Sequence, residues 1–309
     1  MLEEILEIPS RARLCYQKNR GIKLPTGVPY LGMGSSYHAP LTLFYCGKDI
    51  HPRIASEYYN YLARRVLPQG VLISQSGESS ETVWNLDCFR SVIVITNNPN
   101  SSLGTSKKAR KVVELFSGEE KFPTTKSFIN TLIVLYLGLG INPLRGIRAL
   151  EKNFNNFQEF AKRQAEDIFN YLTTKKIKGL YVIGSGPNAG TASQASLTLS
   201  ETTKLSWIGM PVAQYDHGPK ETAENTVVII LNSNGKDKKR IELIKGKLKA
   251  KSNACIIELT EKELPEQLSP FLFITQLNFI MNYLADDMKI KRVFQMGEKV
   301  TTVPKSVHR

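Results

Sequence analysis

The sequence predicts an α/β protein built from two tandem units, each a mainly parallel sheet flanked by helices. Short β-branched runs alternate with longer helical patterns, which is the rhythm of such sheets. That rhythm stops once, after Pro143, for a long polar helix over Leu144–Thr174, and then restarts near residue 180. A chain of 309 residues also has the length of about two domains. We therefore expect a first domain over residues 1–145. Residues 146–309 are expected to hold a linker helix, a second domain and a C-terminal tail.

In the first unit, β-branched runs predict four strands, and helical periodicity predicts three helices between and after them. The expected strands are Val28–Gly32, Gly70–Ser74, Val92–Thr96 and Val112–Leu115. The expected helices are Tyr37–Cys46, Ser80–Phe89 and Thr125–Leu139. The apolar run Phe128–Ile141 is shorter than the roughly 20 residues that a membrane helix needs, so it predicts a buried core helix.

The second unit repeats the pattern, and the two halves look like copies of one unit. Its expected strands are Leu180–Gly184, Leu205–Ile208, Val227–Leu231 and Ala254–Leu259. Its expected helices are Asn188–Thr203 and Ser269–Met288. In both halves the first strand ends in a turn of glycine and serine, and an apolar helix closes the unit.

The composition is that of an ordinary globular chain with an excess of positive charge. Lys and Arg number 41 against 28 Asp and Glu, a net charge of +13. The most basic stretch, Lys236–Lys251, has Ile241, Ile244 and Leu248 at helical spacing, which predicts a surface helix with a solvated basic face. We expect no nucleic-acid or membrane partner. Met1–Ser10 is acidic and unlike a signal peptide, so we expect a cytoplasmic protein.

Three turns rich in Ser and Thr, at residues 34–38, 74–79 and 123–126, are candidates for an anion site. Ligands of parallel sheets bind beyond the carboxyl ends of the strands, where helices begin. Helix N-termini and hydroxyl groups suit phosphate oxygens. One such turn is weak evidence because Ser is also a common helix cap. Three turns on successive strand ends of one sheet indicate a phosphate site.

The sequence Ser74-Gln75-Ser76-Gly77-Glu78-Ser79 resembles the phosphate loop of the sugar isomerase (SIS) family. More narrowly, it resembles the isomerase half of the glutamine:fructose-6-phosphate amidotransferases. Further pieces occur in family order: Gly34–Ala39, Ala55–Tyr58, Thr96–Asn97, Ser101–Leu103, Thr124–Phe128, His217–Pro219 and Pro304–Val307. The resemblance covers nearly the whole chain and implies two tandem flavodoxin-like SIS domains.

The resemblance assigns roles to individual residues. It implies that the sugar phosphate is bound by residues of the first unit: Ser36, Ser74, Gln75, Ser76, Ser79 and Thr124. It implies three catalytic residues: Glu201, His217 and Lys305. Glu201 lies sixteen residues before His217, which is the separation that the family shows between its base and its histidine.

These roles fit the chemistry of aldose–ketose isomerisation. One base must move a proton between C1 and C2, and burial raises the pKa of a glutamate toward working pH. Imidazole can shuttle a proton during ring opening, and a lysine can close over the sugar or form a Schiff base. The plain alternatives are a surface glutamate on a helix, an exposed turn histidine and a lysine near the chain end.

The resemblance implies a phosphosugar aldose–ketose isomerase, with glucosamine-6-phosphate deaminase as the favoured activity, giving fructose 6-phosphate and ammonia. A phosphoglucose or phosphomannose isomerase and a non-catalytic sugar-phosphate sensor are the alternatives. Thr198 and Gln194 depart from the family, which has Lys and Glu there. The start, Met1-Leu2-Glu3, predicts no glutaminase domain, so a partner would have to supply ammonia for synthesis.

The expected partners are a hexose 6-phosphate or an amino-hexose 6-phosphate and a second copy of the chain. The family's histidine reaches an active site across a dimer interface, so we expect a homodimer with its active site near that interface. Proton transfer through an enediol needs no cofactor, and the four scattered histidines predict no metal site. The second glycine-serine turn, Gly184–Pro187, lacks the full phosphate loop, so we expect one sugar-phosphate site per chain.

Overall fold

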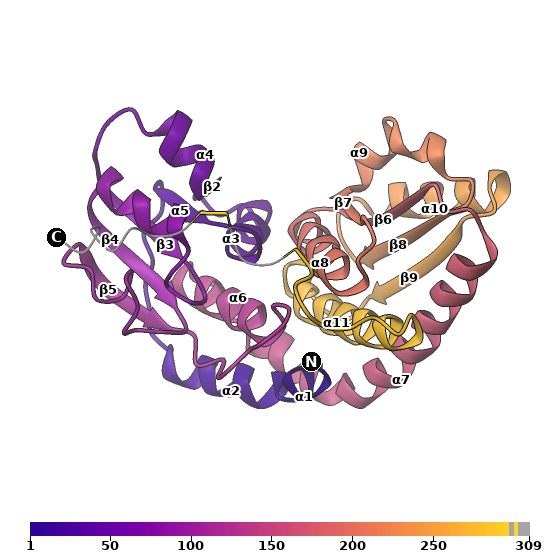
Figure 1. Ribbon diagram of the computed structural model, residues 1–309, viewed down its shortest axis with the longest axis horizontal. Coiled ribbons are helices and arrows are strands. Elements are labelled where there is room, and N and C mark those ends of the chain that lie inside the picture. The colour runs from indigo at the N-terminus through magenta and orange to yellow at the C-terminus, as the bar shows by residue number, and fades with distance from the viewer. Residues whose placement is uncertain (297–299, 302–309) are drawn as a thin grey trace. The chain divides into compact units, whose positions relative to one another are not determined.

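The computed structural model describes residues 1–296 and 300–301, and its contacts divide the chain into two compact units. The first-sheet unit comprises residues 10–120, 126–143 and the chain from Phe294. The second-sheet unit comprises Met1–Pro9, Lys121–Thr125 and Leu144–Val293. Each unit holds one parallel sheet flanked by helices (Figure 1), so the predicted fold class is confirmed.

The first sheet has five parallel strands in the order β2-β1-β3-β4-β5. Their bounds are Pro29–Gly32 (β1), His51–Ile54 (β2), Leu67–Ile73 (β3), Phe89–Thr96 (β4) and Ala109–Glu114 (β5). The four predicted strands are present, and β2 was missed. Three of the four β2 residues are exposed and one is proline, which is tolerated at a sheet edge, so no apolar run marks this strand.

Helices cover both faces of this sheet. They are Ile8–Lys18 (α2), Ser35–Tyr45 (α3), Ala55–Glu57 (α4), Ser80–Trp84 (α5) and Lys126–Gly138 (α6), with a π-helical turn Tyr58–Leu62 (η1) and a 3-10 turn Asn85–Cys88 (η2). Leu31 and Leu72 pack with Val83 on one face, while their neighbours Tyr30 and Val71 are buried on the other. Burial on both faces explains the nearly continuous apolar strands.

The predicted helix Ser80–Phe89 is wrong in its second half. The α-helix ends at Trp84, a 3-10 turn follows, and Phe89 already begins β4. The side-chain amide of Asn85 donates to the carbonyl oxygens of Ala55 and Glu81, both at 2.8 Å. A buried side chain that ties two segments together ends the helix here, and no periodicity in the sequence signals such a contact.

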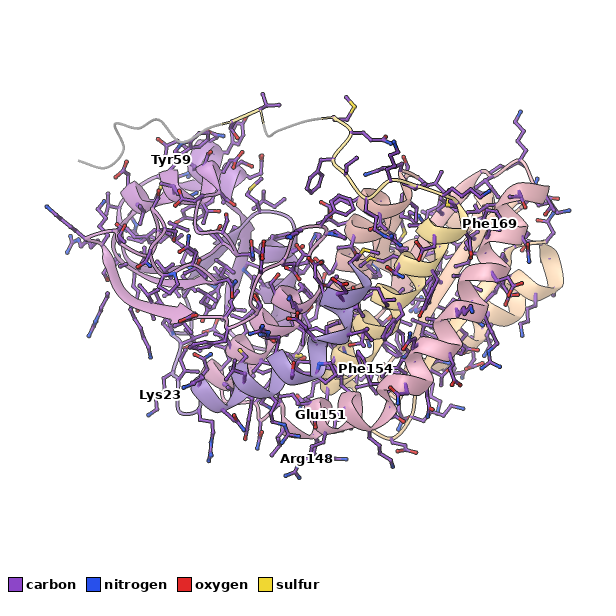
Figure 2. All side chains as sticks on the ribbon, turned by 60° about the horizontal axis from the view of Figure 1, so that its bottom comes forward. Lys23, Tyr59, Arg148, Glu151, Phe154 and Phe169 are labelled. Atoms are coloured by element: carbon purple, nitrogen blue, oxygen red, sulfur yellow. The ribbon has the colours of Figure 1, made fainter. Side chains whose placement is uncertain are left out.

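Tyr58 forms part of η1 and stacks on Phe89 with ring centroids 5.9 Å apart. Tyr59 and Tyr61 are exposed, and the ring of Tyr59 (Figure 2) lies 5.7 Å from that of Trp84. Tyr58 is therefore a packing residue.

The second sheet has four parallel strands in the order β7-β6-β8-β9. Their bounds are Gly179–Gly184 (β6), Ile208–Pro211 (β7), Thr226–Ser233 (β8) and Cys255–Glu261 (β9). The prediction of a strand over Leu205–Ile208 is wrong by three residues. Trp207 is held instead by the preceding helix, with its amide on Ser200 Oγ at 3.0 Å and its indole on Thr203 Oγ1 at 3.1 Å.

Helices also cover both faces of the second sheet (Figure 1). The helices of this unit are Leu2–Leu6 (α1), Leu144–Thr174 (α7), Pro187–Thr203 (α8), Val212–Asp216 (α9), Lys238–Lys251 (α10) and Pro270–Asp287 (α11), with 3-10 turns Pro219–Thr222 (η3) and Glu266–Leu268 (η4). Phe154 of α7 meets Phe279 of α11 edge to face at 5.2 Å, whereas Arg148 lies on the outer side of α7 (Figure 2).

The basic helix and the apolar helix follow their predictions. Ile241, Ile244 and Leu248 of α10 are buried, most of its lysines are exposed, and α6 is a core helix. Among the described residues, no helix is both long and apolar enough to cross a membrane. The same part of the chain shows no cluster of three or more acidic, His or Cys side chains suited to a metal ion.

Candidate functional site

The first sheet has a topological switch point between β1 and β3. Strand β1 pairs with β2 on one side and with β3 on the other. The connection after β1 therefore leads toward β2, whereas the connection after β3 leads the other way, toward β4. Ligands of open parallel sheets bind at such points, beyond the carboxyl ends of the strands. The turn after β1 carries Ser36, and the turn after β3 is the loop Ser74–Ser79. The structure thus brings two of the three predicted turns to the same edge of the first sheet, on neighbouring strands.

The loop Ser74–Ser79 is organised by its own hydroxyl groups. Ser74 Oγ accepts the amide of Gly77 at 3.1 Å and donates to Ser79 Oγ at 3.2 Å. Ser76 Oγ, which is exposed, accepts the amide of Glu78 at 3.2 Å. Ser79 is the residue before α5, so the loop leads into the free amides of a helix start. Hydroxyl and amide donors around one turn suit the oxygens of a phosphate.

No residue other than glycine fits at position 77 of the loop. Its φ is +72°, in the left-handed region, and a Cβ there would lie 1.8 Å from Ser101 Oγ. The turn after β4 supports the loop from this side. The amides of Asn97 and Leu103 donate to the carbonyl oxygens of Gln75 and Gly77 at 2.9 and 3.1 Å. These backbone bonds hold the loop in one conformation before any ligand binds.

Glu78 and Ser102 form a second link between the two turns, which sequence reasoning missed. One carboxylate oxygen of Glu78 accepts the amide of Ser102 at 2.7 Å, and the other accepts its hydroxyl at 2.5 Å. Ser101–Leu103 belongs to the family pattern, so the sequence marked this segment. The spacing of its residues does not show that Ser102 bonds to Glu78.

We expect Glu78→Ala to weaken binding of fructose 6-phosphate about 3- to 10-fold, because hydrogen bonds to a charged group contribute about 1.5–3 kcal/mol and this pair is exposed. Isothermal titration calorimetry measures the effect. Ser102→Ala should weaken binding less, and the double variant should fall short of the sum, because both changes break one link. Additive effects, or unchanged affinity in Glu78→Ala, would contradict this role.

Ser36 and Thr124, the two predicted sugar contacts, lie in different units. Ser36 is half-buried in the first turn of α3, so close to β1 that a Cβ on Gly32 would lie 2.6 Å from its backbone. Thr124 is half-buried and belongs to the second-sheet unit. Its turn leads into the start of α6, and residues 115–125 separate this helix from the end of β5.

The C-terminal tail contacts the helix that follows the loop Ser74–Ser79. Ser80 Oγ donates to the carbonyl oxygen of Thr301 at 3.2 Å, and Thr301 Oγ1 donates to Glu81 Oε1 at 2.5 Å. No sequence pattern predicts this contact, which joins residues more than 200 positions apart. Lys305, the predicted closing lysine, lies outside the described residues.

Glu201 lies in the last turn of α8 and is half-buried. Thr198 and Gln194, one and two turns earlier, are fully buried, and Thr198 Oγ1 donates to the carbonyl oxygen of Gln194 at 3.2 Å. The interior side of α8 is therefore neutral where the family pattern has two charges. Glu201 belongs to the second-sheet unit, as does His217.

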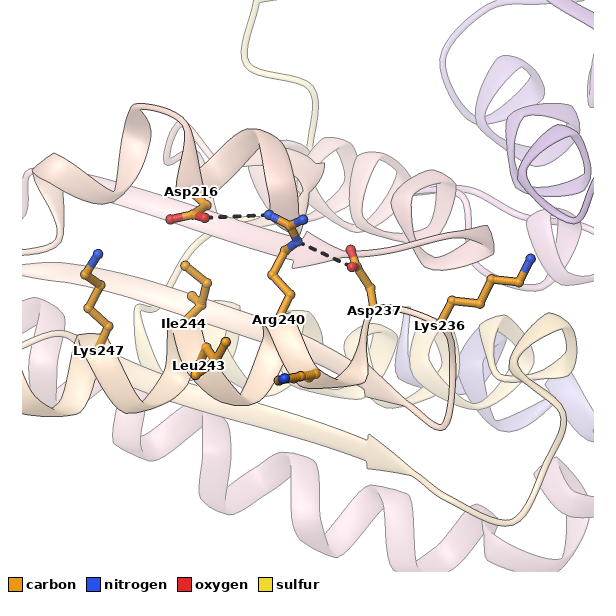
Figure 3. A pocket seen from close by; sticks show the side chains of 8 residues that line it. Asp216, Lys236, Asp237, Arg240, Leu243, Ile244 and Lys247 are labelled. Carbon is orange, nitrogen blue, oxygen red and sulfur yellow. Dashed lines mark hydrogen bonds and ion pairs between the residues drawn. The ribbon is translucent and has the colours of Figure 1, made fainter.

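His217 is exposed and directly follows α9, whose end is fixed by ion pairs. Lys220 Nζ donates to Asp216 at 2.7 Å, and this bond lowers the pKa of the Asp216 carboxyl. Arg240 lies 3.7 Å from Asp216 and 3.3 Å from Asp237, along a hollow of about 520 Å³ (Figure 3). These pairs anchor the turn that carries His217 to the start of α10.

The second sheet also has a switch point, between β6 and β8, and the carboxylate of Glu266 lies beside it. Ser233 Oγ donates to Glu266 Oε1 at 3.2 Å. A Cβ on Gly235 would lie 1.7 Å from the same oxygen, and one on Gly186 would lie 3.4 Å from the carboxyl carbon. The carboxylate puts negative charge beside the turns after β6 and β8, which disfavours an anion there.

The chain has two parallel sheets, and the loop Ser74–Ser79 after β3 of the first sheet is rich in hydroxyl groups. Known proteins share this fold. No protein-family model matches the sequence. Two curated relatives are the glutamine–fructose-6-phosphate aminotransferases (isomerizing) of Sulfolobus acidocaldarius and Gloeobacter violaceus. The first is 27% identical over 66% of this chain, and the second is 28% identical over 74% of it. The chain spans only 36% and 44% of their lengths.

Solved structures match over nearly their full length. The C-terminal domain of glucosamine-fructose-6-phosphate aminotransferase from Francisella tularensis has a TM-score of 0.77 at 19% identity, with 94% of this chain and 97% of that chain covered. The glucosamine-6-phosphate deaminase of Thermotoga maritima has a TM-score of 0.76 at 20% identity, with 94% and 95% covered. The tagatose-6-phosphate ketose/aldose isomerase of Escherichia coli has a TM-score of 0.70 at 16% identity, with 93% and 92% covered. These likenesses show the fold.

Proposed function

We propose that the chain is an SIS-family enzyme that converts glucosamine 6-phosphate to fructose 6-phosphate and ammonia. The observation that carries the proposal is the loop Ser74–Ser79, which places hydroxyl and amide donors at the switch point of the first sheet. Two findings support it: relatives named for a fructose-6-phosphate reaction, and the shared fold of a glucosamine-6-phosphate deaminase.

In the proposed reaction, Ser74, Gln75, Ser76 and Ser79 hold the phosphate and Ser36 contacts the sugar. His217 assists opening of the ring. Glu201 then takes the proton from C2 of the open-chain amino sugar and returns it to C1. This transfer, with uptake of a proton by the C1 oxygen and loss of one from the nitrogen, converts the C1 aldehyde into a hydroxymethyl group and the C2 amine into an imine. Water adds to the imine carbon, and the nitrogen leaves as ammonia. The product is the ketose, fructose 6-phosphate. Lys305 is proposed to close over the sugar, and the reaction needs no cofactor.

A coupled assay with glucosamine 6-phosphate tests this proposal. Ammonia and fructose 6-phosphate are followed together on the purified protein. Equal release of both products supports the deaminase. Turnover of glucose 6-phosphate or mannose 6-phosphate without ammonia would point to the alternative isomerases instead.

We propose further that the active enzyme is a homodimer in which His217 serves the partner's site. The exposure of His217 supports this, because nothing in its own turn encloses the ring. Mixing Glu201→Gln and His217→Ala proteins, each inactive alone, should restore roughly a quarter of wild-type activity, since half of the random dimers hold one complete site. No recovery after subunit exchange, shown by mass spectrometry of differently tagged chains, would place His217 in its own chain's site.

One observation favours a second candidate, a sugar-phosphate-binding sensor. Thr198 and Gln194 are buried and neutral, so the base position on α8 lacks the charged neighbours of the family pattern. A sensor needs the phosphate loop but not Glu201, His217 and Lys305 together. Thermal stabilisation by glucosamine 6-phosphate without any turnover would favour the sensor.

A further inference from the structure

Lys204 joins three segments that are distant in sequence. It is the first residue after α8, and its Nζ donates to the carbonyl oxygen of Glu201 at 2.6 Å and to that of Val293 at 2.8 Å. The same ammonium lies 4.9 Å from the centroid of the Phe122 ring. All four residues belong to the second-sheet unit.

The physical chemistry of these contacts makes the ammonium a tether. The last carbonyl groups of a helix have no partner inside the helix and carry partial negative charge, which a cation stabilises. An ammonium has three donors and no acceptor, so it can satisfy two carbonyl oxygens and still face an aromatic ring. Phe122 is buried, which fixes the third contact in the core rather than on a mobile surface.

Lys204 has a backbone conformation that is unfavourable for lysine. Its φ is 58°, in the left-handed region, where a helix commonly ends with Gly or Asn. A lysine in this conformation is less favourable than either by about 1 kcal/mol. The strain is offset by the contacts that only its ammonium can make, since neither Gly nor Asn reaches two remote segments.

Each tethered segment leads to a residue of the proposed reaction. Glu201 is bound directly. Phe122 lies two positions before Thr124, and Val293 lies twelve positions before Lys305 in the sequence. We propose that Lys204 is a positioning residue, which fixes the end of α8 that carries Glu201 and holds the Thr124 segment and the root of the tail against it. This inference rests on the proposed function of Glu201.

The test compares Lys204→Asn with Lys204→Arg. Asn keeps the left-handed backbone favourable and removes the ammonium, whereas Arg retains a cation that can donate to carbonyl groups and face the ring. Lys289→Asn is the matched control, because Lys289 has the same φ of about 55° but is exposed at the end of α11. Two quantities are measured: kcat and KM for glucosamine 6-phosphate, and amide hydrogen exchange over residues 118–126 and 290–296.

We expect Lys204→Asn to lower kcat about tenfold or more with little change in KM, because the base is misplaced while the phosphate loop is intact. Exchange should rise in both segments. Lys204→Arg should recover most of the kcat, and Lys289→Asn should behave as wild type. Wild-type kcat and unchanged exchange in Lys204→Asn would overturn the inference. If the wild-type protein has no turnover, the proposed function fails, and the exchange measurement alone decides whether Lys204 tethers the two segments.

Discussion

Replacing Glu201 by Gln should abolish turnover and leave ligand binding intact. General-base catalysis contributes about 100- to 10,000-fold, and Gln keeps the size of the side chain but cannot accept the C2 proton. The phosphate loop lies on the first sheet and Glu201 on α8, so the substitution leaves the loop unchanged. We expect kcat to fall by at least 100-fold in the coupled assay, with the same thermal stabilisation by fructose 6-phosphate as wild type.

Glu159→Gln is the matched control for this variant, because Glu159 is an exposed glutamate on α7 with no role in the proposed reaction. It should retain wild-type kcat and KM. Residual activity of Glu201→Gln above a tenth of wild type would show that another group moves the proton.

The second large effect is expected for Gly77→Ala. The added methyl group must displace Ser101, since the ideal Cβ lies 1.8 Å from its hydroxyl oxygen, and the left-handed φ of +72° is itself unfavourable for Ala. The loop between β3 and α5 must then leave its conformation, and with it the Ser74 hydroxyl that accepts the Gly77 amide. We expect the variant to lose measurable stabilisation by fructose 6-phosphate.

Gly47→Ala separates backbone strain from the clash. Gly47 has a φ of +79° and no atom within 4 Å of its Cβ position, and it lies beyond the far end of α3. Both variants pay the conformational cost of about 1–2 kcal/mol, which lowers Tm by a few degrees. Only Gly77→Ala should lose ligand binding. If both variants bind fructose 6-phosphate as wild type does, the loop is not the phosphate site.

The sequence predicted every interior strand of both sheets, together with the edge strands β5 and β9. The strands β3, β4, β6 and β8 are buried on both faces, so their apolar runs identified them. The edge strands β2 and β7 were missed or misplaced, because their residues are largely exposed or only half-buried. A local sequence pattern reveals a strand through its buried apolar residues, and β2 and β7 have few of them.

For the candidate site, the sequence located the loop Ser74–Ser79 but not what holds it. The pairs Glu78–Ser102 and Ser80–Thr301 depend on contacts across 24 and 221 positions, which no local spacing reveals. The same is true of Lys204 and Val293, and of Glu266 beside the second switch point. The roles of Glu201, His217 and Lys305 stay predictions.

The central claim is that this protein moves a proton between C1 and C2 of a hexose 6-phosphate. Incubating it with fructose 6-phosphate and ammonium chloride in D2O and recording proton NMR spectra tests that step directly, because the C2 imine of the proposed reaction forms from the ketose and ammonia, and its C1 proton then exchanges through Glu201. We predict loss of a C1 proton signal as solvent deuterium enters, and no loss with Glu201→Gln. If fructose 6-phosphate stabilises the wild-type protein but its C1 protons do not exchange, the protein binds the sugar phosphate without isomerising it.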